Sequence, residues 1–390
     1  MNDIDLSVVS SWSTGNERYG GRFDGNGYTI SNLSSTTQGL FNSIGQNVSI
    51  KDLNLKNFNI TVASTERSLQ IGPLANIMEG GWVQNVHVIG GTIKNSSTSY
   101  YWTGGLIGEV NGGIPDASYS VCDYRTATIK DSSSSANVSG GDAVGGLFGW
   151  ICSSGCEVTI DNCWASGSVT ESYNYGAGGL VGEILVYGTS SGAGTVTITN
   201  SYATGNVSGT ESVGGFIGLA STSVAGDKII IKNCWSSGYA ASSGDIVGGF
   251  IGETEGYNTN SKVEIYNSYS LGSANGKQYV GGFIGYSSNT YVSNSFSAGT
   301  ISGSSSLGGF DGYSSGTSYS ACHFNSSTSD SGSGLTGHAA SWWTEKNIYD
   351  TLGVQLLGYK AQGKAGITGL SEAQAKELGF VAVKTASELV

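Results

Sequence analysis

The sequence has few charged residues, almost no proline and no long apolar run. Charged side chains make up 12% of the 390 residues, and 29 acidic against 17 basic residues give a net charge of −12. Between Asp131 and Glu345 there is no arginine and there are only four lysines. Because phosphate groups are recognised by clustered Lys and Arg, this composition argues against nucleic acid and anionic membranes as partners. No segment is apolar for long enough to cross a bilayer, so we expect no membrane insertion.

Sequence motifs for catalysis and cofactor binding are also missing. There is no HExxH zinc-peptidase motif and no GxSxG nucleophile elbow with a convincing histidine partner. Gly25-Asn26-Gly27 is too short for a phosphate-binding loop and does not open a helix, so it is interpreted as a turn. We therefore predict no catalytic residue, no metal ion and no cofactor.

Glycine, in contrast, is abundant and recurs in a regular pattern. A pentapeptide of the form GG[LF]xG occurs seven times, at Gly104–Gly108, Gly145–Gly149, Gly178–Gly182, Gly214–Gly218, Gly248–Gly252, Gly281–Gly285 and Gly308–Gly312. The shortest spacing between two starts is 27 residues (281 to 308) and the longest is 41 (104 to 145). A repeat of nearly fixed period indicates a solenoid, in which each unit buries its apolar face against its neighbours.

A second motif, Asn-Ser/Cys-aromatic, runs in step with the first. Its members are Asn162, Asn200, Asn233, Asn267 and Asn294, with the aromatic residues Trp164, Tyr202, Trp235, Tyr269 and Phe296. Each follows a short run of strand-forming residues, so each repeat holds two strand-rich halves of roughly 17 residues. A half of that length is typical of one coil of a parallel β-helix. This interpretation predicts roughly 16 to 18 coils and a length on the order of 80 Å.

Stacked coils place equivalent residues on top of one another, about 4.8 Å apart. We therefore expect the asparagines to form a ladder of side-chain hydrogen bonds and the aromatic residues to form a second ladder of packed rings. The paired glycines suit a bend with positive φ, or a place where the backbone packs too closely for a Cβ atom. All these positions are interpreted as structural rather than functional.

The two motifs together resemble the GLUG repeat of bacterial secreted and surface proteins. The resemblance covers about residues 20 to 325, and Gly21–Leu33 is similar to the first coil of such proteins. It implies a right-handed parallel β-helix, found in adhesin-like exoproteins and in the flanking regions of some bacterial IgA-cleaving metallopeptidases. It also implies an extracellular or bacterial cell-surface location, but no particular reaction.

We divide the chain into three parts. Residues 1–20 are expected to cap the N-terminal end, residues 21–325 to form the GLUG-repeat β-helix, and residues 326–390 to be a linker with a C-terminal cap or the start of a following module. A capping-box sequence at Ser371–Gln374 predicts a short helix that ends at Gly379. The predicted fold class is thus all-β, with a small C-terminal α/β capping element. Met1 is not followed by a signal peptide, so we expect a segment whose partner is the rest of a larger exoprotein.

The six cysteines leave their redox state open. Cys152 and Cys156 could close a small loop as a disulfide; free thiols and a metal site are the alternatives, and a metal would need two further ligands nearby. Cys163 and Cys234 occupy the same motif position two repeats apart, about 19 Å on the expected coil count, which is too far for a disulfide. The remaining two cysteines are expected to have no partner.

Aromatic residues outside the ladder are the candidate ligand-binding residues. They flank three of the pentapeptides and comprise Tyr100, Tyr101, Trp102, Tyr173, Tyr175 and Tyr257. Tyrosine and tryptophan combine an apolar face with a polar group, which suits contact with sugar rings or with protein; the alternative is that these rings cap turns. We favour a non-enzymatic adhesin or stalk module that presents a binding surface for a host glycan or a protein receptor.

Glycan cleavage, as in polysaccharide lyases and phage tailspikes, is the second hypothesis. Asp227, Lys228, Lys262 and Glu264 form the best charged group for it, because they fall one repeat apart. Ordinary surface charges at strand ends explain the same residues equally well.

Two further patterns are weighed against that hypothesis. Glu109, Glu183 and Glu253 each directly follow a pentapeptide, but a separation of about 19 Å would be too large for a glycosidase pair. A third hypothesis, an ice-binding β-helix, needs a regular array of threonines. The run Thr195–Thr199 places threonines on one strand only, and the array does not recur.

Overall fold

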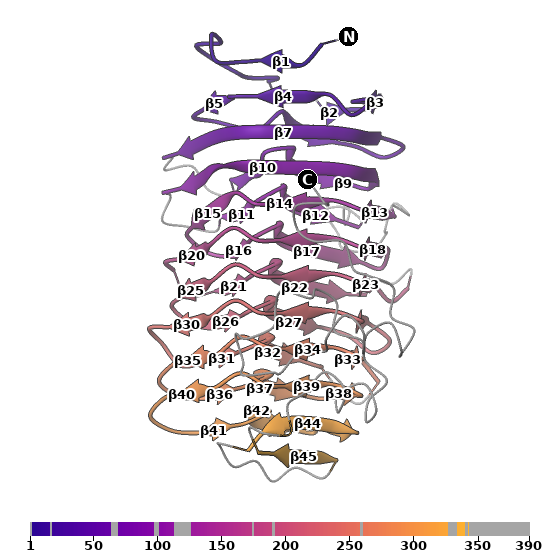
Figure 1. Cartoon of the computed structure of the whole chain (residues 1–390). Coiled ribbons are helices and arrows are strands. Elements are labelled where there is room, and N and C mark those ends of the chain that lie inside the picture. Colours follow the sequence, from indigo (N-terminus) through magenta and orange to yellow (C-terminus); the bar gives the residue numbers. More distant parts are fainter. Residues whose placement is uncertain are drawn as a thin grey trace, which may run out of the picture.

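The computed structural model describes residues 2–15, 18–63, 69–96, 101–112, 126–173, 175–188, 192–257, 260–326, 334–339 and 342. Over these residues the chain forms strands and turns and no α-helix. The strands stack as the rungs of one ladder, and the sequence runs steadily along its axis from β1 to β45 (Figure 1). All strand pairs are parallel, so the predicted all-β parallel β-helix is confirmed.

Three sheets make up the sides of the coil. The ten-stranded sheet contains β2 (Arg18–Tyr19), β6 (Phe41–Ile44), β9 (Ala75–Glu79), β12 (Ile107–Asn111), β17 (Phe148–Ser154), β22 (Val181–Tyr187), β27 (Ile217–Thr222), β32 (Ile251–Glu255), β37 (Ile284–Ser288) and β42 (Asp311–Ser315). The eight-stranded sheet contains β8 (Gln70–Ile71), β11 (Trp102–Gly104), β16 (Val144–Gly145), β21 (Gly176–Gly178), β26 (Ser212–Gly214), β31 (Val247–Gly248), β36 (Val280–Gly281) and β41 (Leu307–Gly308).

The remaining strands belong to a 27-stranded sheet, called here the long sheet. It contains β1 (Ile4–Asp5), β3 (Arg22–Asp24), β4 (Thr29–Ser31), β5 (Ser34–Ser35), β7 (Ser49–Val62), β10 (Gly81–Asn95), β13 (Ala127–Lys130), β14 (Ser133–Ser134), β15 (Asn137–Gly140), β18 (Glu157–Asp161), β19 (Trp164–Ala165), β20 (Val169–Glu171), β23 (Thr195–Thr199), β24 (Tyr202–Ala203), β25 (Val207–Gly209), β28 (Lys228–Lys232), β29 (Trp235–Ser236), β30 (Ala240–Ser242), β33 (Lys262–Tyr266), β34 (Tyr269–Ser270), β35 (Ala274–Asn275), β38 (Thr290–Ser293), β39 (Phe296–Ser297), β40 (Ile301–Ser302), β43 (Ser318–Ser320), β44 (Cys322–Asn325) and β45 (Leu335–His338). In the regular repeats each coil contributes three of these strands in succession.

One repeat forms one coil, which corrects the predicted 16 to 18 coils. Glu157 pairs with Thr195, and Val181 pairs with Ile217, so a strand meets the equivalent strand of the next repeat. The two halves of a repeat lie on different sides of the same coil, because the chain bends at the asparagine and again at the pentapeptide. Successive pairings along the long sheet from β1 to β45 stack 12 strands, so the described part of the rod is about 53 Å long rather than 80 Å.

The core consists of one apolar residue at each inward position of every coil. Ile129, Ile160, Ile198, Ile231 and Ile265 follow one another along the long sheet and are fully buried. The third residue of the later pentapeptides adds an internal column of phenylalanines. The rings of Phe216, Phe250, Phe283 and Phe310 stack with centroids 4.8, 4.8 and 4.7 Å apart. Stacked rings at this distance combine apolar burial with a favourable ring geometry.

The pentapeptide glycines are required by close packing rather than by positive φ, since none of them has a positive φ value. A Cβ atom on Gly146 would lie 2.1 Å from the Gly179 carbonyl oxygen and 2.9 Å from the Ala165 Cβ atom. A Cβ atom on Gly145 would lie 1.9 Å from the Phe148 carbonyl oxygen. The chain thus turns from the eight-stranded sheet into the ten-stranded sheet through a corner that has no room for side chains.

The motif asparagines lie where the long sheet kinks. All have left-handed backbone conformations, with φ between 48° and 56° along the column Asp52, Asn85, Asp131, Asn162, Asn200, Asn233, Asn267 and Asn294. Asn and Asp tolerate this conformation better than other residues with a Cβ atom. The Nδ2 atom of Asn267 donates to Asn233 Oδ1 at 3.2 Å, and that of Asn233 donates to Asn200 Oδ1 at 3.1 Å.

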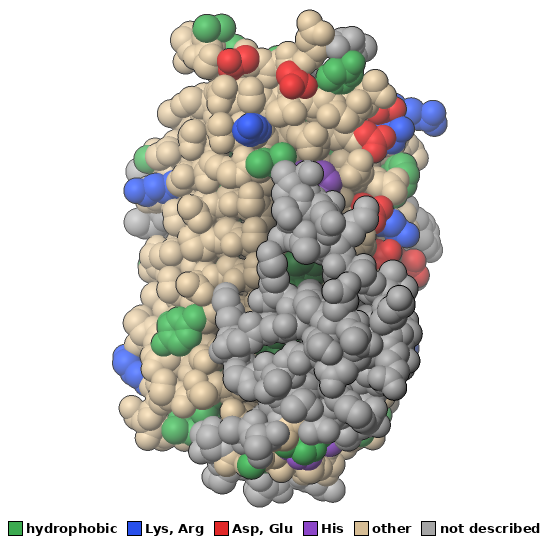
Figure 2. Space-filling model, viewed as in Figure 1, with side chains coloured by type: hydrophobic (Ala, Val, Ile, Leu, Met, Phe, Trp, Pro, Cys, Tyr) green, Lys and Arg blue, Asp and Glu red, His purple; other side chains and the backbone are tan. Residues whose placement is uncertain are grey.

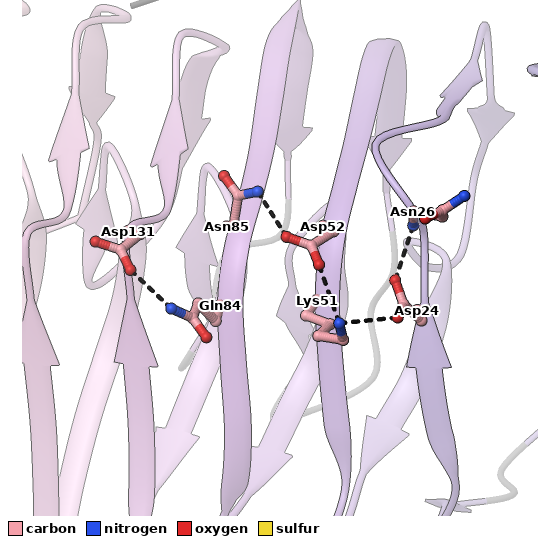
Figure 3. A network of polar contacts seen from close by, with 7 residues as sticks. All are labelled: Asp24, Asn26, Lys51, Asp52, Gln84, Asn85 and Asp131. Carbon is pink, nitrogen blue, oxygen red and sulfur yellow. Dashed lines mark hydrogen bonds and ion pairs between the residues drawn. The ribbon is translucent and has the colours of Figure 1, made fainter.

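The N-terminal end of this column contains aspartates as well as amides (Figure 3). Asn85 donates to Asp52 Oδ1 at 2.7 Å, and Lys51 lies 3.2 Å from Asp52 and 2.8 Å from Asp24. Gln84 donates to Asp131 Oδ2 at 3.0 Å, and Asn162 donates to Asp131 Oδ1 at 2.8 Å. The hydrogen bond from Asn162 lowers the pKa of the Asp131 carboxyl group.

The motif aromatic residues form a column on the outer side of the long sheet. Their rings are nearly parallel, with centroid distances of 5.9, 4.6, 5.8 and 4.9 Å along Trp164, Tyr202, Trp235, Tyr269 and Phe296. The neighbours of Trp164 along the chain, Cys163 and Ala165, belong to the core, and strand alternation therefore directs Trp164 away from it. At the C-terminal end His323 and Trp342 continue the column, with their rings 5.8 Å apart.

The structure excludes the Cys152–Cys156 disulfide, one of the three states that the sequence leaves open for these cysteines. Cys152 is a free, buried thiol, whereas Cys156 is disulfide-bonded and therefore has another partner. The reason is local: β17 runs extended through Ser154 and the chain turns only at Gly155, so Cys152 lies within β17 whereas Cys156 directly precedes β18. Burial raises the pKa of the Cys152 thiol.

Cys163 and Cys234 are also free and buried, as is Cys322. The corrected coil count places Cys163 and Cys234 two coils apart, which is about 9.6 Å rather than 19 Å. A disulfide needs Cα atoms within about 7 Å, so these thiols remain apart on the new count as well.

Most of the predicted N-terminal cap, residues 1–20, lies within the described residues. At the N-terminal end the indole Nε1 of Trp12 donates to the carbonyl oxygens of Gly39 and Leu40, at 3.0 and 3.3 Å. The predicted helix at 371–379, and most of the predicted C-terminal element 326–390, lie outside the described residues. The described part of the chain contains no helix that is long and apolar enough to span a membrane.

Candidate functional site

The predicted ligand-binding aromatics lie in several different environments. Tyr100 is outside the described residues. Tyr101 is 1% exposed, and its backbone N–H donates to Asp142 Oδ2 at 2.7 Å. Trp102 is half-buried, and its ring stacks on that of Trp150 with centroids 4.1 Å apart. Of Tyr101 and Trp102, only Trp102 has a partly exposed side chain that a ligand could reach.

Tyr173, Tyr175 and Tyr257 are exposed, at 53%, 38% and 67%. Tyr175 directly precedes β21 and has the same position in its coil as Tyr101, two coils away. Tyr257 follows β32, at the opposite edge of the ten-stranded sheet. The structure therefore brings Trp102 and Tyr175 to one edge of the coil and leaves Tyr257 apart from them.

The most distinctive outer surface lies where the ten-stranded and eight-stranded sheets meet. We call this surface the glycine corner. It consists of one outward row of the ten-stranded sheet together with Trp102 and Ser212 of the eight-stranded sheet and Tyr279, which directly precedes β36 of that sheet. Successive strand pairings order the row as Glu109, Trp150, Glu183, Leu219, Glu253, Tyr286 and Tyr313. None of these residues belongs to the apolar core, whereas the first four members of the next row do, namely Val110, Ile151, Ile184 and Ala220.

Contacts across the corner join the two sheets. The Trp102 and Trp150 rings stack at its N-terminal end. In the middle, Ser212 Oγ donates to Glu253 Oε2 at 2.5 Å. Because the pentapeptide has no side chains at the bend, outward groups from both sheets approach one another there. The corner thus combines aromatic rings, hydroxyl groups and carboxyl groups in one continuous strip.

Three carboxyl groups of the corner have raised pKa values. Burial is the largest cause for each, and it raises the pKa of Glu109, Glu183 and Glu253 to about 7. Nearby acidic groups add to the effect, such as Asp142 beside Glu183. These groups therefore keep their protons to a higher pH than an ordinary glutamate does, and a protonated carboxyl group can both donate and accept a hydrogen bond.

The corrected coil count changes the distance between these carboxyl groups. Glu183 pairs with Leu219 and Leu219 with Glu253, so the two glutamates lie two coils apart, about 9.6 Å at the backbone. The sequence-based estimate of 19 Å was wrong, because it counted two coils for each repeat. Glycosidase carboxyl pairs of the inverting type lie about 6.5 to 9.5 Å apart, so the spacing no longer excludes such a pair.

Three tyrosines close the C-terminal end of the corner. The rings of Tyr286 and Tyr313 stack at 5.2 Å with planes 13° apart, and Tyr279 packs edge-on against both, at 5.9 and 5.5 Å. Tyr279 has a φ of 50°, a left-handed conformation that is unusual for a large side chain. Position-by-position alignment of the pentapeptides would have placed Tyr286 and Tyr313 in the glutamate row, whereas nothing in the sequence signals the conformation of Tyr279.

The charged group considered for glycan cleavage does not form a site. Asp227 is fully buried, and its carboxylate accepts backbone N–H bonds from Gly188, Gly194 and Val224 at 3.0, 2.9 and 3.0 Å. It therefore holds the surrounding turns in place.

The other members of that group are surface residues of the long sheet. Lys228 and Lys262 are exposed and adjacent on paired strands, and Glu264 accepts a hydrogen bond from the Tyr266 hydroxyl at 3.1 Å. Thr128, Thr159 and Thr197 align on three coils, but the next residue in that row is Ile230. Within the described ranges, no cluster of three or more His, Cys, Asp or Glu side chains could hold a metal ion.

Comparisons with known proteins relate one part of the chain to a family. Residues 15–90 match the profile of the M26 IgA1-specific metallo-endopeptidase N-terminal region. A search among curated proteins finds no significant match. A crystal structure described as a "putative immunoglobulin A1 protease" from Bacteroides ovatus is 16% identical, with 90% of this chain and 79% of that chain covered, at a TM-score of 0.37.

Proposed function

We propose that the chain is a non-enzymatic, surface-exposed adhesin or stalk module of a bacterial exoprotein, and that the glycine corner is its binding surface for a host glycan or protein. The observation that carries the proposal is the outward row from Glu109 to Tyr313, in which aromatic and carboxyl side chains follow one another along the rigid coil. Groups fixed on strands lose little conformational freedom when a ligand binds, which favours affinity.

The match of residues 15–90 supports the extracellular location and the larger context. The matched profile describes the N-terminal region of IgA1-specific metallo-endopeptidases. We therefore propose that this chain works outside the cell as one part of a longer exoprotein, and that it holds or targets the rest of that protein.

A panel of purified host glycans and host surface proteins tests this function, with binding and loss of glycan chain length measured together. Trp102→Ala removes the ring that stacks on Trp150 and should weaken binding at least several-fold. Trp82→Ala is the matched control, because Trp82 is a partly exposed tryptophan of the long sheet. Equal losses for both variants, or binding that neither changes, would place the ligand elsewhere on the molecule.

Glycan cleavage at the corner is the second candidate, because Glu183 and Glu253 lie in one row only two coils apart. In an inverting hydrolysis one carboxylic acid protonates the glycosidic oxygen, and the other carboxylate removes a proton from the attacking water. Burial gives both groups a pKa of about 7, which suits a proton donor and a proton acceptor at neutral pH.

Shortening of a glycan by the unmodified chain, abolished by both Glu183→Gln and Glu253→Gln, would establish this activity. Glu255→Gln is the control, because Glu255 is exposed in the next outward row of the same strand. Shortening that survives both substitutions would rule out the corner as the catalytic centre.

A further inference from the structure

The tyrosines at the C-terminal end of the glycine corner differ from the rest of the row in one respect. Among the described residues, β42 is the last strand of the ten-stranded sheet, so Tyr313 is the last member of the row in that part of the chain. One face of the Tyr313 ring packs on Tyr286, and the residue remains 46% exposed. Tyr313 is therefore the last ring of the stack within the described residues, and about half of the residue is exposed.

The surrounding tyrosines fix the orientation of this ring. Tyr286 lies parallel beneath it, and Tyr279 packs edge-on against both rings. Tyr279 adopts its left-handed conformation at a cost that an unconstrained tyrosine would avoid. A flat ring held by two others forms a rigid stacking platform, because little side-chain entropy is lost when a ligand covers it.

Polar groups extend from this platform toward the middle of the corner. Glu253 precedes Tyr286 in the row by one coil and shares a hydrogen bond with Ser212. The distance from Glu253 to Tyr313 is two coils, or about 9.6 Å at the backbone. An aromatic face followed by carboxyl and hydroxyl groups offers an apolar contact and then several acceptors and donors, which matches the ring face and hydroxyl groups of a sugar.

Charge decides which sugars fit. Glu253 and Glu255 lie on the neighbouring coil, and four lysines are the only cationic residues from Asp131 to Glu345. Three of these lysines, Lys228, Lys232 and Lys262, lie on the long sheet, and the fourth, Lys277, is exposed two residues before Tyr279. Glu211 and Glu255 both act electrostatically on Glu253, so acidic groups outnumber this one cation near the strip, and a sialylated or sulfated chain would bind there at a cost in free energy. A protein partner would favour a more apolar and less charged patch.

We propose that the strip formed by Tyr313, Tyr286, Tyr279, Glu253 and Ser212 binds an uncharged oligosaccharide, with one sugar ring stacked on Tyr313. The proposal rests on the binding function given above and narrows its ligand to neutral glycans. Sialylated or sulfated glycans of the same backbone should bind at least tenfold more weakly than the neutral chain, and the difference should shrink as added salt screens the charges.

Isothermal titration of the full chain with neutral hexose oligosaccharides, and with their sialylated and sulfated forms, is the test. Tyr313→Ala should weaken binding of the neutral oligosaccharide about tenfold, while Tyr313→Phe should retain most of it. Tyr239→Ala is the control, because Tyr239 is 44% exposed beside β30 of the long sheet. Tyr313 lies at the surface of the last coil, and circular dichroism of each variant checks that the coils remain folded.

Three results would overturn the inference: stronger binding of the anionic glycans, no loss on Tyr313→Ala, or an equal loss on Tyr239→Ala. Binding of a host protein with no binding of any oligosaccharide would also overturn it, while leaving the broader binding function intact. Loss of every interaction in the panel would overturn both.

Discussion

Replacement of Glu109 by glutamine should stabilise the protein at alkaline pH. Glu109 is 6% exposed, and burial raises its pKa from 4.5 to about 7, with Asn111 donating to it at 3.3 Å. A raised pKa means that the folded chain holds the proton more tightly than the unfolded chain does. The stability that this provides is fully present below pH 4.5 and is lost as the pH rises through 7.

The size of the effect follows from the shift. A change from 4.5 to about 7 corresponds to about 3 kcal/mol, the cost of keeping the ionised carboxylate buried at pH 8. Glutamine has nearly the same shape and never ionises, so it avoids this cost. The free energy of unfolding of Glu109→Gln should therefore equal that of the unmodified chain near pH 4 and exceed it by about 3 kcal/mol at pH 8.

Urea unfolding at several pH values, followed by tryptophan fluorescence, measures this difference. The comparison uses the change between variant and unmodified chain at each pH, because Glu183 and Glu253 add a similar pH dependence to both. Glu157→Gln, an exposed position at the start of β18, is the control and should change stability little at any pH. A Glu109→Gln variant that is destabilised equally at pH 5 and pH 8 would refute the reasoning, because it would show that the carboxylate is ionised and paired.

Three other predictions concern the scaffold. Gly146→Ala should lower the free energy of unfolding by several kcal/mol, because its Cβ atom would clash with the Gly179 carbonyl oxygen. Gly20→Ala is the control, since a Cβ atom there has no neighbour within 4 Å, and thermal melts compare the two variants. Asn233→Ala should lower the free energy of unfolding by about 1 to 2 kcal/mol, and Asn233→Gly should lower it less, because glycine adopts positive φ freely. Equal losses for the two variants in urea titrations would mean that the side-chain hydrogen bonds dominate instead. Burial, with His338 as a second cause, lowers the pKa of His323 to about 4. The stability that depends on neutral His323 is therefore fully present above pH 6.5 and is lost as the pH falls through 4. His323→Phe should remove this acid sensitivity, which limited proteolysis at several pH values measures.

The fold class could be predicted from the sequence because two motifs recur in step. The pentapeptide marks a corner where Cβ atoms have no room, and the asparagine marks a kink with left-handed backbone, so each motif has one physical cause. The number of coils could not be predicted from segment length alone. A half-repeat of roughly 17 residues fits one small coil as well as it fits half of a larger one, and only the pairing of Glu157 with Thr195 separates the two.

The candidate site was harder to predict, because the error in coil count carried over to it. Glu183 and Glu253 were noticed in the sequence but placed twice as far apart as they are. The Trp102–Trp150 stack joins two sheets and therefore depends on how the corner folds. The state of Cys152 could not be predicted for a similar reason, since spacing along the chain does not show where an extended strand ends.

The one-coil repeat also sets the units in which this protein can change length. Deletion of a whole repeat would shorten the rod by about 4.8 Å and leave every row in line. The glutamates, however, occupy every second coil of their row, with Trp150 and Leu219 between them. Removal of the coil with Leu219 would bring two acidic groups to about 4.8 Å and roughly double their repulsion. Loss or gain of two repeats at a time keeps the alternation, so pairs of coils are the module by which such a rod can grow or shrink.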